Sequence, residues 1–322
     1  APLFGMRFIE LFGSARQKGE ELTQYHMDIA ASVQRHTENV IFHVLHRLHE
    51  LTGLDRVCIA GGVAQNSVAN GKITRNTPFK EVYIPSAGHD AGIAMGSAQY
   101  HWHHDLGRER VAPIFSAYTG SQFTDDEIAA YLESEGVAYT RYSSDEELYD
   151  VVSDALVDGA VIGWFSGRAE FGPRALGARS IIVDPRREDA KELLNSKIKR
   201  RESFRPFAPS ILSEHVGDWF ELDEPVPFME QVFPIRPEKQ PEIPAVTHLD
   251  GSGRLQSVYK DVAVRYHALI SAFHSKTGVP ILLNTSFNEN EPIVNAPQHA
   301  LACFQRTSMD MLVMGNCVIR RT

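Results

Sequence analysis

The chain has 322 residues, of which 43% are hydrophobic and 23% charged, and its 41 acidic against 32 basic side chains give a net charge of −9. These proportions are typical of a globular protein, the length favours two domains, and the acidic balance disfavours bulk binding to nucleic acid. No run approaches the ~20 apolar residues of a membrane span, and the first residues lack the basic and apolar regions of a signal peptide, so we expect a soluble, cytoplasmic protein. Three scattered cysteines, Cys58, Cys303 and Cys317, predict core thiols rather than a disulfide framework or a metal site.

The first hundred residues predict helices alternating with two short strands. From Thr23 to Glu50 the apolar residues recur every three or four positions, which predicts a long amphipathic helix closed by Gly53. Two β-rich runs follow, RVCI and EVYIP, and each ends in a glycine-rich turn that leads into a helix. This order predicts an α/β domain with ligand-binding loops at the strand ends.

The composition becomes polar beyond residue 107, and a short amphipathic helix is predicted near 128–135. We predict a first domain at 1–110, a linker at 111–144 and a second domain at 145–322. The second domain again alternates helices and strands, and its last segment, 309–321, is predicted as a single final strand. The proline-rich segment 225–248 is expected to be a long ordered loop or a partly mobile lid.

The two glycine-rich turns of the first domain hold candidate ligand-binding residues. Gly61, Gly62 and Asn66 follow the first strand, where a backbone without side chains and a helix amino terminus can bind a phosphate or ribose. A plain tight turn would use the same residues. Asp90 follows the second strand, where its carboxylate either binds a divalent cation or caps the next helix. The histidines of the HWHH run do not have the spacing of metal ligands and are interpreted as surface residues.

Basic residues of the second domain gather beside glycine-rich turns. Arginine and lysine bind phosphate oxygens, and a solvated basic face is the alternative. The glycines and proline around Arg174 and Arg179 favour a fixed turn and hence a binding role. The positions singled out are Arg168, Arg174, Arg179, Lys197, Lys199, Arg200, Arg201, Arg205 and Arg254.

Short polar side chains, from Asn284 to Asn288, follow the apolar run PILL. Hydroxyls and amides at the end of a strand can bind a ribose, a carbonyl or an adenine edge. The same residue types also make ordinary turns, so both interpretations stay open for Ser286 and Asn288.

Taken together, the motifs resemble one family over nearly the whole chain. The runs MDIAASVQRHTENV, CIAGGVAQNSVANGKI and SAGHDAGIAMGSA resemble the carboxy-terminal half of the catalytic domain of the O-carbamoyltransferases of nodulation-factor and antibiotic biosynthesis. The runs AEFGPRALGARSIIVDPR, FRPFAPSIL, HLDGSGRLQ and GVPILLNTSFNENEPIV resemble that family's carboxy-terminal domain. The resemblance implies an α/β protein: the carboxy-terminal lobe of an actin-like, sugar-kinase-like domain, followed by a YrdC-like domain similar to synthases of threonylcarbamoyl adenylate.

The resemblance also implies a two-step reaction. Carbamoyl phosphate and ATP, with Mg²⁺, would form carbamoyl adenylate in the second domain, and the first would transfer the carbamoyl group to a hydroxyl of a small-molecule natural product, releasing AMP. The adenylate-forming family has a Lys-x-Arg pair, matched by Lys199 and Arg201, and a Ser-x-Asn turn, matched by Ser286 and Asn288. The further ATP and carbamoyl phosphate ligands are expected to be Arg168, Arg174, Arg205 and Arg254, with Gly61, Gly62 and Asn66 on the nucleotide loop of the first domain.

Asp90 falls on the family's metal-binding aspartate, which implies a divalent metal such as Fe²⁺ in the actin-like domain. The family's other metal ligands are histidines with HxxxH spacing in the first half of that domain, and no equivalent segment is present in this sequence. The numbering opens on Ala1 within what reads as a loop, so a fragment is expected. We therefore expect an upstream half of the domain, in the same or a separate polypeptide, to complete the transfer site.

Two alternatives stay open. One is a carbamoyl-adenylate synthase that passes its product to another transferase, as in hydrogenase maturation; the sequence lacks the zinc-finger and acylphosphatase-like segments of that maturation protein, which disfavours it. The other is a non-catalytic nucleic-acid-binding subunit, which the net charge of −9 disfavours.

Overall fold

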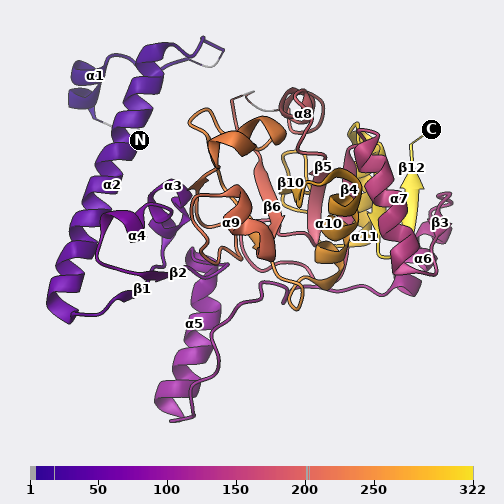
Figure 1. The fold of residues 1–322 in the computed structure, drawn as a ribbon, viewed down its shortest axis with the longest axis horizontal. Coiled ribbons are helices and arrows are strands. Elements are labelled where there is room, and N and C mark those ends of the chain that lie inside the picture. Colours follow the sequence, from indigo (N-terminus) through magenta and orange to yellow (C-terminus); the bar gives the residue numbers. More distant parts are fainter. Residues whose placement is uncertain (1–4, 18, 201, 203, 322) are drawn as a thin grey trace. The chain divides into compact units, whose positions relative to one another are not determined.

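The computed structural model describes residues 5–17, 19–200, 202 and 204–321, and it divides into two compact units that meet in sequence between Thr52 and Gly53. The first unit consists of α1 (Met6–Phe12) and the long helix α2 (Gln24–Thr52), as Figure 1 shows. The predicted amphipathic helix is confirmed, and Gly53 beyond it has a φ of 65°. None of the helices in the described ranges is both long enough and apolar enough to cross a membrane.

The second unit begins with a small parallel sheet. Strands β1 (Arg56–Cys58) and β2 (Glu81–Tyr83) pair with Val57 opposite Val82, as the two β-rich runs predict. Parallel strands end at the same edge, so the glycine-rich turns that follow them lie side by side. Short helical segments surround the pair: η1 (Gly62–Gln65), α3 (Ser67–Asn70), α4 (Ile73–Asn76), η2 (Asp90–Gly92), α5 (Ile93–Tyr100) and the π-helical turn η3 (His101–Asp105).

The larger part of the second unit is built on one mixed sheet of eight strands. Its order is β3-β12-β11-β4-β5-β10-β6-β9, and all neighbours are antiparallel except the pairs β11–β4 and β6–β9. The strands are β3 (Thr140–Arg141), β4 (Ile162–Phe165), β5 (Arg179–Val183), β6 (Ala208–Leu212), β9 (Gln256–Val258), β10 (Ile281–Ser286), β11 (Met311–Met314) and β12 (Cys317–Arg320). A separate two-stranded pair joins β7 (Phe233–Pro234) to β8 (Ser252–Gly253).

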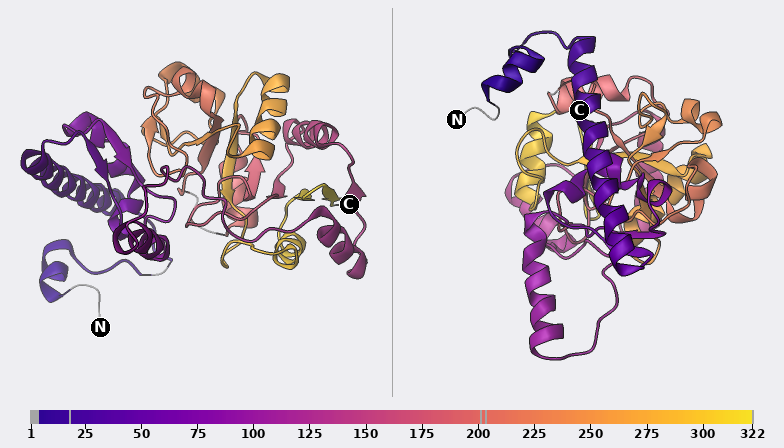
Figure 2. Two further views of the ribbon diagram at one scale, coloured as in Figure 1. Left: turned by 90° about the horizontal axis from the view of Figure 1, so that it is seen from below. Right: turned by 90° about the vertical axis from the view of Figure 1, so that its left-hand side faces the viewer.

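Helices cover both faces of this sheet, which is why every residue of the central strands β4 and β5 is buried. Figure 2 shows α7 (Asp145–Val157) and α10 (Val264–Thr277) on one face, and α6 (Asp125–Ser134) and α11 (Pro297–Arg306) on the other. The shorter helical elements are α8 (Ala190–Leu193), the π-helical turn η4 (Leu194–Ile198), η5 (Ser213–His215), α9 (Val216–Trp219) and η6 (Pro237–Glu242).

Local sequence signals set the ends of these helices. Thr124 and Glu127 form a capping box at the start of α6, and Ser144 caps α7. Helix α10 ends where Gly278 adopts a left-handed conformation, with a φ of 74°. Helix α11 begins at Pro297, whose fixed φ suits the first helical position.

Two sequence expectations change in the structure, and the helix predicted near 128–135 is confirmed as α6. The final segment is not one strand but the hairpin β11–β12, because Gly315, with a φ of 58°, lets the chain reverse at the Gly-Asn pair. Cys58 is exposed at the end of β1, whereas Cys303 and Cys317 are fully buried as predicted. The helix predicted inside the linker packs on the sheet through Ile128 and Leu132, which are buried in the main core.

Segment 225–248 is ordered and packed rather than a lid. Its apolar side chains, including Val226, Phe228 and Phe233, are buried. Its backbone also joins the large sheet to the helices beside the small sheet, because the Asn70 amide donates to the carbonyl of Glu230 over 2.9 Å and Val232 N–H donates to the carbonyl of Ser67. Burial raises the pKa of the Glu230 carboxyl to about 8, although the backbone N–H of Phe228 donates to it.

The raised pKa of Glu230 predicts a pH-dependent stability. Between its unfolded pKa, about 4.5, and its folded pKa, about 8, the folded chain binds more protons, so the contribution of Glu230 to stability is lost as the pH rises. Glu230→Gln keeps an acceptor for Phe228 N–H without the charge. We expect its free energy of unfolding, relative to the parent protein, to increase by on the order of 2 kcal/mol between pH 5 and pH 8.

Urea unfolding at pH 5, 6, 7 and 8 measures this difference. The exposed Glu221→Gln is the matched control and should give the same small difference at every pH. A difference for Glu230→Gln that does not change with pH would contradict the burial of a protonated carboxyl at this position.

Candidate functional site

A buried lysine lies at the centre of the candidate site. Lys199 follows η4, and its side chain is only 2% exposed because Leu194 and Ile198 anchor the helix in the core. Its ammonium donates to the carbonyl and hydroxyl of Ser286 and, over 2.8 and 2.7 Å, to the carbonyl and side-chain oxygens of Asn288. The end of β10 therefore supplies four oxygen atoms to one cation.

The loops after η4 and after β10 enclose a polar cavity of about 370 Å³. They are separated by more than 80 residues in sequence, and the central position of β10 beside β5 and β6 brings them together. The cavity is lined by Lys199, Arg200, Glu202, Arg205, Ser286, Asn288, Glu289 and Asn290. Of the predicted site residues, Lys199, Arg205, Ser286 and Asn288 thus share one cavity. Arg201 falls outside the described residues.

Carboxylates balance the arginines around this cavity. Arg200 lies 3.0 Å from Glu289, whose side chain is 13% exposed, and Arg205 lies 2.9 Å from Glu202. Sequence reasoning singled out the cations and missed both glutamates, although Glu202 stands within the basic run and Glu289 directly follows Asn288. An anion that enters the cavity would have to compete with these carboxylates for Arg200 and Arg205.

Arg254 lies between β8 and β9 and is not among the residues that line this cavity. It is close enough to His248 to act on its charge: burial, then the positive charges of Arg254 and Lys191, lower the pKa of His248 to about 4, against the opposing effect of Asp250. The Nδ1 atom of His248 is 3.1 Å from the Ser252 hydroxyl, which donates to Asp250 over 2.6 Å. His248 is therefore neutral near pH 7 and lies close to Arg254. Both residues belong to the run HLDGSGRLQ, and this shared motif is the sequence signal that could have identified the histidine.

The loop between β4 and β5 carries Arg168 and Arg174, and Arg179 is the first residue of β5; the three arginines have different surroundings. Arg168 is exposed and donates to the carbonyl of Thr119. Arg174 is half-buried, and burial lowers its pKa. Arg179 is fully buried in β5.

Arg179 has a structural role, contrary to its inclusion among the phosphate-binding candidates. Its guanidinium donates to the carbonyls of Ser166, Gly167 and Ser121 and lies 3.7 Å from the ring centre of Phe165. Burial lowers its pKa to about 10. Its Nε atom has no hydrogen-bond partner among the described residues, but the side chain is fully buried, so a ligand from solvent cannot reach the guanidinium.

The two turns after β1 and β2 meet as their parallel pairing requires. Gly61, with a φ of 98°, donates its N–H to the carbonyl of Gly88 over 2.6 Å. Asn66 caps α3 by accepting from Ala69 N–H, which is the plain structural role of such a residue. Asp90 is exposed at the start of η2, and the structure gives that helix no side-chain cap. Within the described ranges, no group of three His, Cys, Asp or Glu side chains could hold a metal ion.

Family models match two long stretches of the chain. A model described as the carbamoyltransferase N-terminus matches residues 3–99, and one described as the carbamoyltransferase C-terminus matches residues 153–321. The first stretch contains both glycine-rich turns, and the second contains the cavity around Lys199. The boundaries predicted for the two domains and the linker stay a prediction.

Curated relatives are similar over almost the whole chain. The uncharacterised protein sll1178 of Synechocystis is 45% identical over 98% of this chain and 56% of its own length. Nodulation protein NolNO of Sinorhizobium fredii is 44% identical over 95% of this chain and 46% of its own length, and nodulation protein NolO of Bradyrhizobium diazoefficiens is 40% identical over 95% and 57%. The chain thus spans about half the length of these relatives.

Among solved structures, full-length HypF in a phosphate- and nucleotide-bound form is similar to 57% of this chain and 23% of its own, with 16% identity and a TM-score of 0.37. A likeness at that level supports no conclusion about the arrangement of the domains. The two family models and the identities of 40–44% to the nodulation proteins establish the family without it. The chain belongs to the carbamoyltransferase family, as its motifs predicted.

Proposed function

We propose that this chain is the adenylate-forming part, together with part of the transfer site, of an ATP-dependent O-carbamoyltransferase. The observation that carries the proposal is the buried Lys199 ammonium in the wall of a 370 Å³ polar cavity, within the stretch that the carbamoyltransferase C-terminus model matches. In this proposal the region from α7 onward, residues 145–322, is the YrdC-like domain, and residues 1–110, which contain β1 and β2, are the carboxy-terminal lobe of an actin-like domain.

In the first half-reaction, carbamoyl phosphate and ATP, as its Mg²⁺ complex, bind the second domain. Forming carbamoyl adenylate releases pyrophosphate from ATP and orthophosphate from carbamoyl phosphate, with one water consumed. Both substrates bring several negative charges, and Lys199, Arg205, Arg174, Arg168, Arg201 and Arg254 are the cations that we assign to them.

Lys199 is well placed for this role because it is desolvated. A positive charge fixed in a protein wall acts on a phosphate more strongly than one in open water, and it needs no reorganisation during the reaction. Its bonds to Ser286 and Asn288 also fix the loop after β10, so one side chain both charges and shapes the cavity.

The second half-reaction transfers the carbamoyl group to the hydroxyl of a small-molecule natural product and releases AMP. We assign Gly61, Gly62 and Asn66 to the nucleotide in this step. A resident Fe²⁺ does not fit the described residues by themselves, because Asp90 offers a single exposed carboxylate, and we derive no step from it. We propose that an amino-terminal half, such as the longer relatives have room for, completes the acceptor site and supplies any further metal ligands.

Removing the Lys199 charge should abolish adenylate formation. We expect Lys199→Met, which keeps most of the side-chain length, to slow carbamoyl-phosphate-dependent release of pyrophosphate from ATP by on the order of a hundred- to a thousand-fold. The control is Lys276→Met on α10, which removes a lysine that pairs with Asp150 and Asp154 of α7, away from the cavity lining. Near-normal pyrophosphate release by folded Lys199→Met would refute the assignment; circular dichroism checks the fold.

Asp90→Asn should separate the two half-reactions. The amide keeps the shape of the side chain without its charge. Because Asp90 lies on the turn after β2 and does not line the cavity of Lys199, we expect pyrophosphate release to stay within about twofold of the parent protein. Carbamoyl transfer, measured with an amino-terminal half supplied, should be lost. Full transfer by Asp90→Asn would remove this residue from the proposed site.

A further inference from the structure

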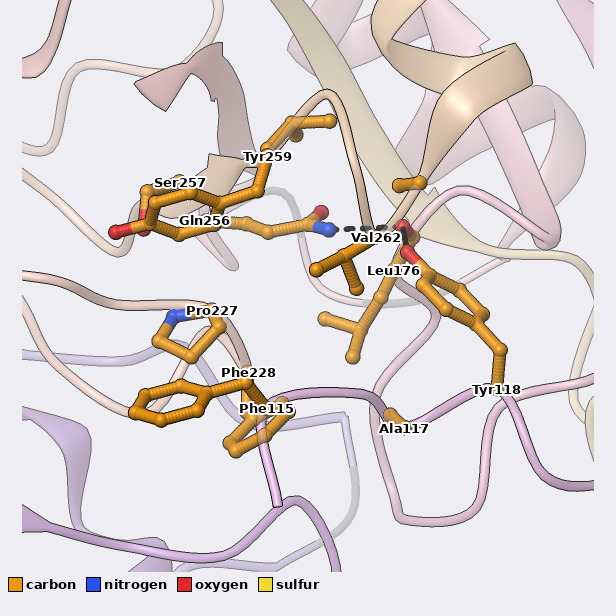
Figure 3. A pocket seen from close by; sticks show the side chains of 12 residues that line it. Phe115, Ala117, Tyr118, Leu176, Pro227, Phe228, Gln256, Ser257, Tyr259 and Val262 are labelled. Carbon is orange, nitrogen blue, oxygen red and sulfur yellow. Dashed lines mark hydrogen bonds between the residues drawn. The ribbon is translucent and has the colours of Figure 1, made fainter. Parts of the chain in front are cut away.

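The loop that carries Arg174 is held by an unusual set of buried polar side chains. The Asn284 amide donates to the carbonyl of Ala175 over 3.1 Å, and the Trp164 indole donates to that of Gly177 over 2.9 Å. The carbonyl of Leu176 accepts two hydrogen bonds, from the Gln256 amide at 2.8 Å and the Tyr118 hydroxyl at 2.7 Å. Figure 3 shows these last two donors converging on Leu176 from opposite sides of the loop.

The N–H groups of the same loop are bound as well. One carboxylate oxygen of Glu170 accepts from Leu176 and Ala178, over 2.7 Å each, and the Ser180 hydroxyl accepts from Gly177 over 3.0 Å. Three successive carbonyls and three successive N–H groups are thus bound to side chains. Residues 175–178 are buried, so these backbone groups cannot turn to water, and the side chains that bind them fix the loop in a single conformation.

Apart from Tyr118, the donors stand on strands of the large sheet, where apolar residues would be the ordinary choice. Gln256, Asn284 and Ser210 are each at most 2% exposed and stand on the neighbouring strands β9, β10 and β6. They also bind one another: the Ser210 hydroxyl donates to Gln256 over 2.7 Å and accepts from Asn284 at 3.0 Å. Buried amides cost stability unless their bonds are made, and the Asn284 side-chain oxygen has no hydrogen-bond partner among the described residues. A network that is kept at this cost and aimed at one loop indicates that the position of that loop matters.

The network has no room for a ligand of its own. The cavity beside Tyr118, Leu176 and Gln256 holds about 10 Å³, roughly the space of one water molecule (Figure 3). Two glycines of the loop are also fixed by close contacts: a Cβ on Gly177 would lie 2.0 Å from the ring of Tyr266, and one on Gly172 would lie 2.4 Å from the carbonyl of Ser86. The side chains therefore act on the loop itself.

What the loop presents is Arg174. Its guanidinium is partly desolvated, and within the described ranges it makes no hydrogen bond or ion pair, in contrast to Arg179 at the end of the same loop. A cation that is held out of water without a counter-charge attracts an anion. Its rigid support lowers the cost of ordering the side chain when that anion binds.

We propose that Gln256, Asn284 and Tyr118 are positioning residues that hold the Arg174 loop in the conformation in which its guanidinium binds a phosphate group of the substrates. The inference rests on the proposed function, in which Arg174 binds carbamoyl phosphate or ATP. These buried residues would then change the affinity for the substrate without touching it, because they act through the loop.

The test compares Gln256→Leu with Gln231→Leu, the same change at another side chain that is 2% exposed but makes no bond to the loop. We expect Gln256→Leu to raise the KM for carbamoyl phosphate or for ATP about tenfold in the pyrophosphate-release assay, and Gln231→Leu to change neither. The substrate whose KM rises is the one that Arg174 binds. Tyr118→Phe, which keeps the ring and loses one hydrogen-bond donor, should raise the same KM about threefold. This milder substitution still tests the inference if Gln256→Leu fails to fold.

A double-mutant cycle distinguishes positioning from general stability. In the Arg174→Ala background, Gln256→Leu should cause no further change in KM, because both substitutions remove the same interaction. Equal effects in both backgrounds, or a lower melting temperature with an unchanged KM, would overturn the inference.

The Kd of inorganic phosphate, measured by calorimetry, gives the same comparison without turnover. If the parent protein releases no pyrophosphate, the proposed function fails, and the inference is then decided by whether Arg174→Ala and Gln256→Leu weaken phosphate binding together. A parent protein that is active and unaffected by Gln256→Leu and Tyr118→Phe refutes the inference alone.

Discussion

The contact between the Lys199 ammonium and the oxygen atoms of Ser286 and Asn288 is the constraint on which the site depends. It joins the end of η4 to the end of β10, and the ion pair between Arg200 and Glu289 joins the same two loops beside it. A lysine that is 2% exposed has lost most of its hydration, so its four oxygen contacts compensate for that loss. The carboxylates Glu289 and Glu202 balance the neighbouring arginines Arg200 and Arg205.

A second buried polar network, around Gln256 and Asn284, stands beside the first on the same strand β10. Asn284 supports the Arg174 loop from the middle of the strand, and Ser286, two residues on, binds Lys199 at its end. Residues two apart on a strand point to the same face, so both groups act from one side of the sheet. An apolar interior would stabilise a sheet of this size more easily. The buried polar residues lower its stability, and their hydrogen bonds fix the geometry of the loops.

The region around the small sheet has a looser construction. Its two glycine-rich turns are joined backbone to backbone through Gly61 and Gly88, and Asp90 stands exposed beside them. The nodulation proteins similar to this chain are about twice its length, and the carbamoyltransferase N-terminus model matches residues 3–99 of this chain. These turns expose backbone groups and one carboxylate, whereas charged side chains line the cavity of Lys199.

Most helices and strands, and the family, could be predicted from the sequence, because periodicity, caps and turn residues act over a few positions. The long helix α2, the turns after β1 and β2, and the motifs around Lys199 and Ser286 are all local patterns of this kind. Sequence reasoning missed the β11–β12 hairpin, since one glycine with a positive φ divides an otherwise continuous apolar run. Only the tertiary structure decided what each arginine does. Arg174 and Arg179 stand five residues apart in one motif, yet the core takes up the guanidinium of Arg179 and leaves that of Arg174 without a described partner. Burial and hydrogen bonding depend on strands far away in sequence, which no local pattern records.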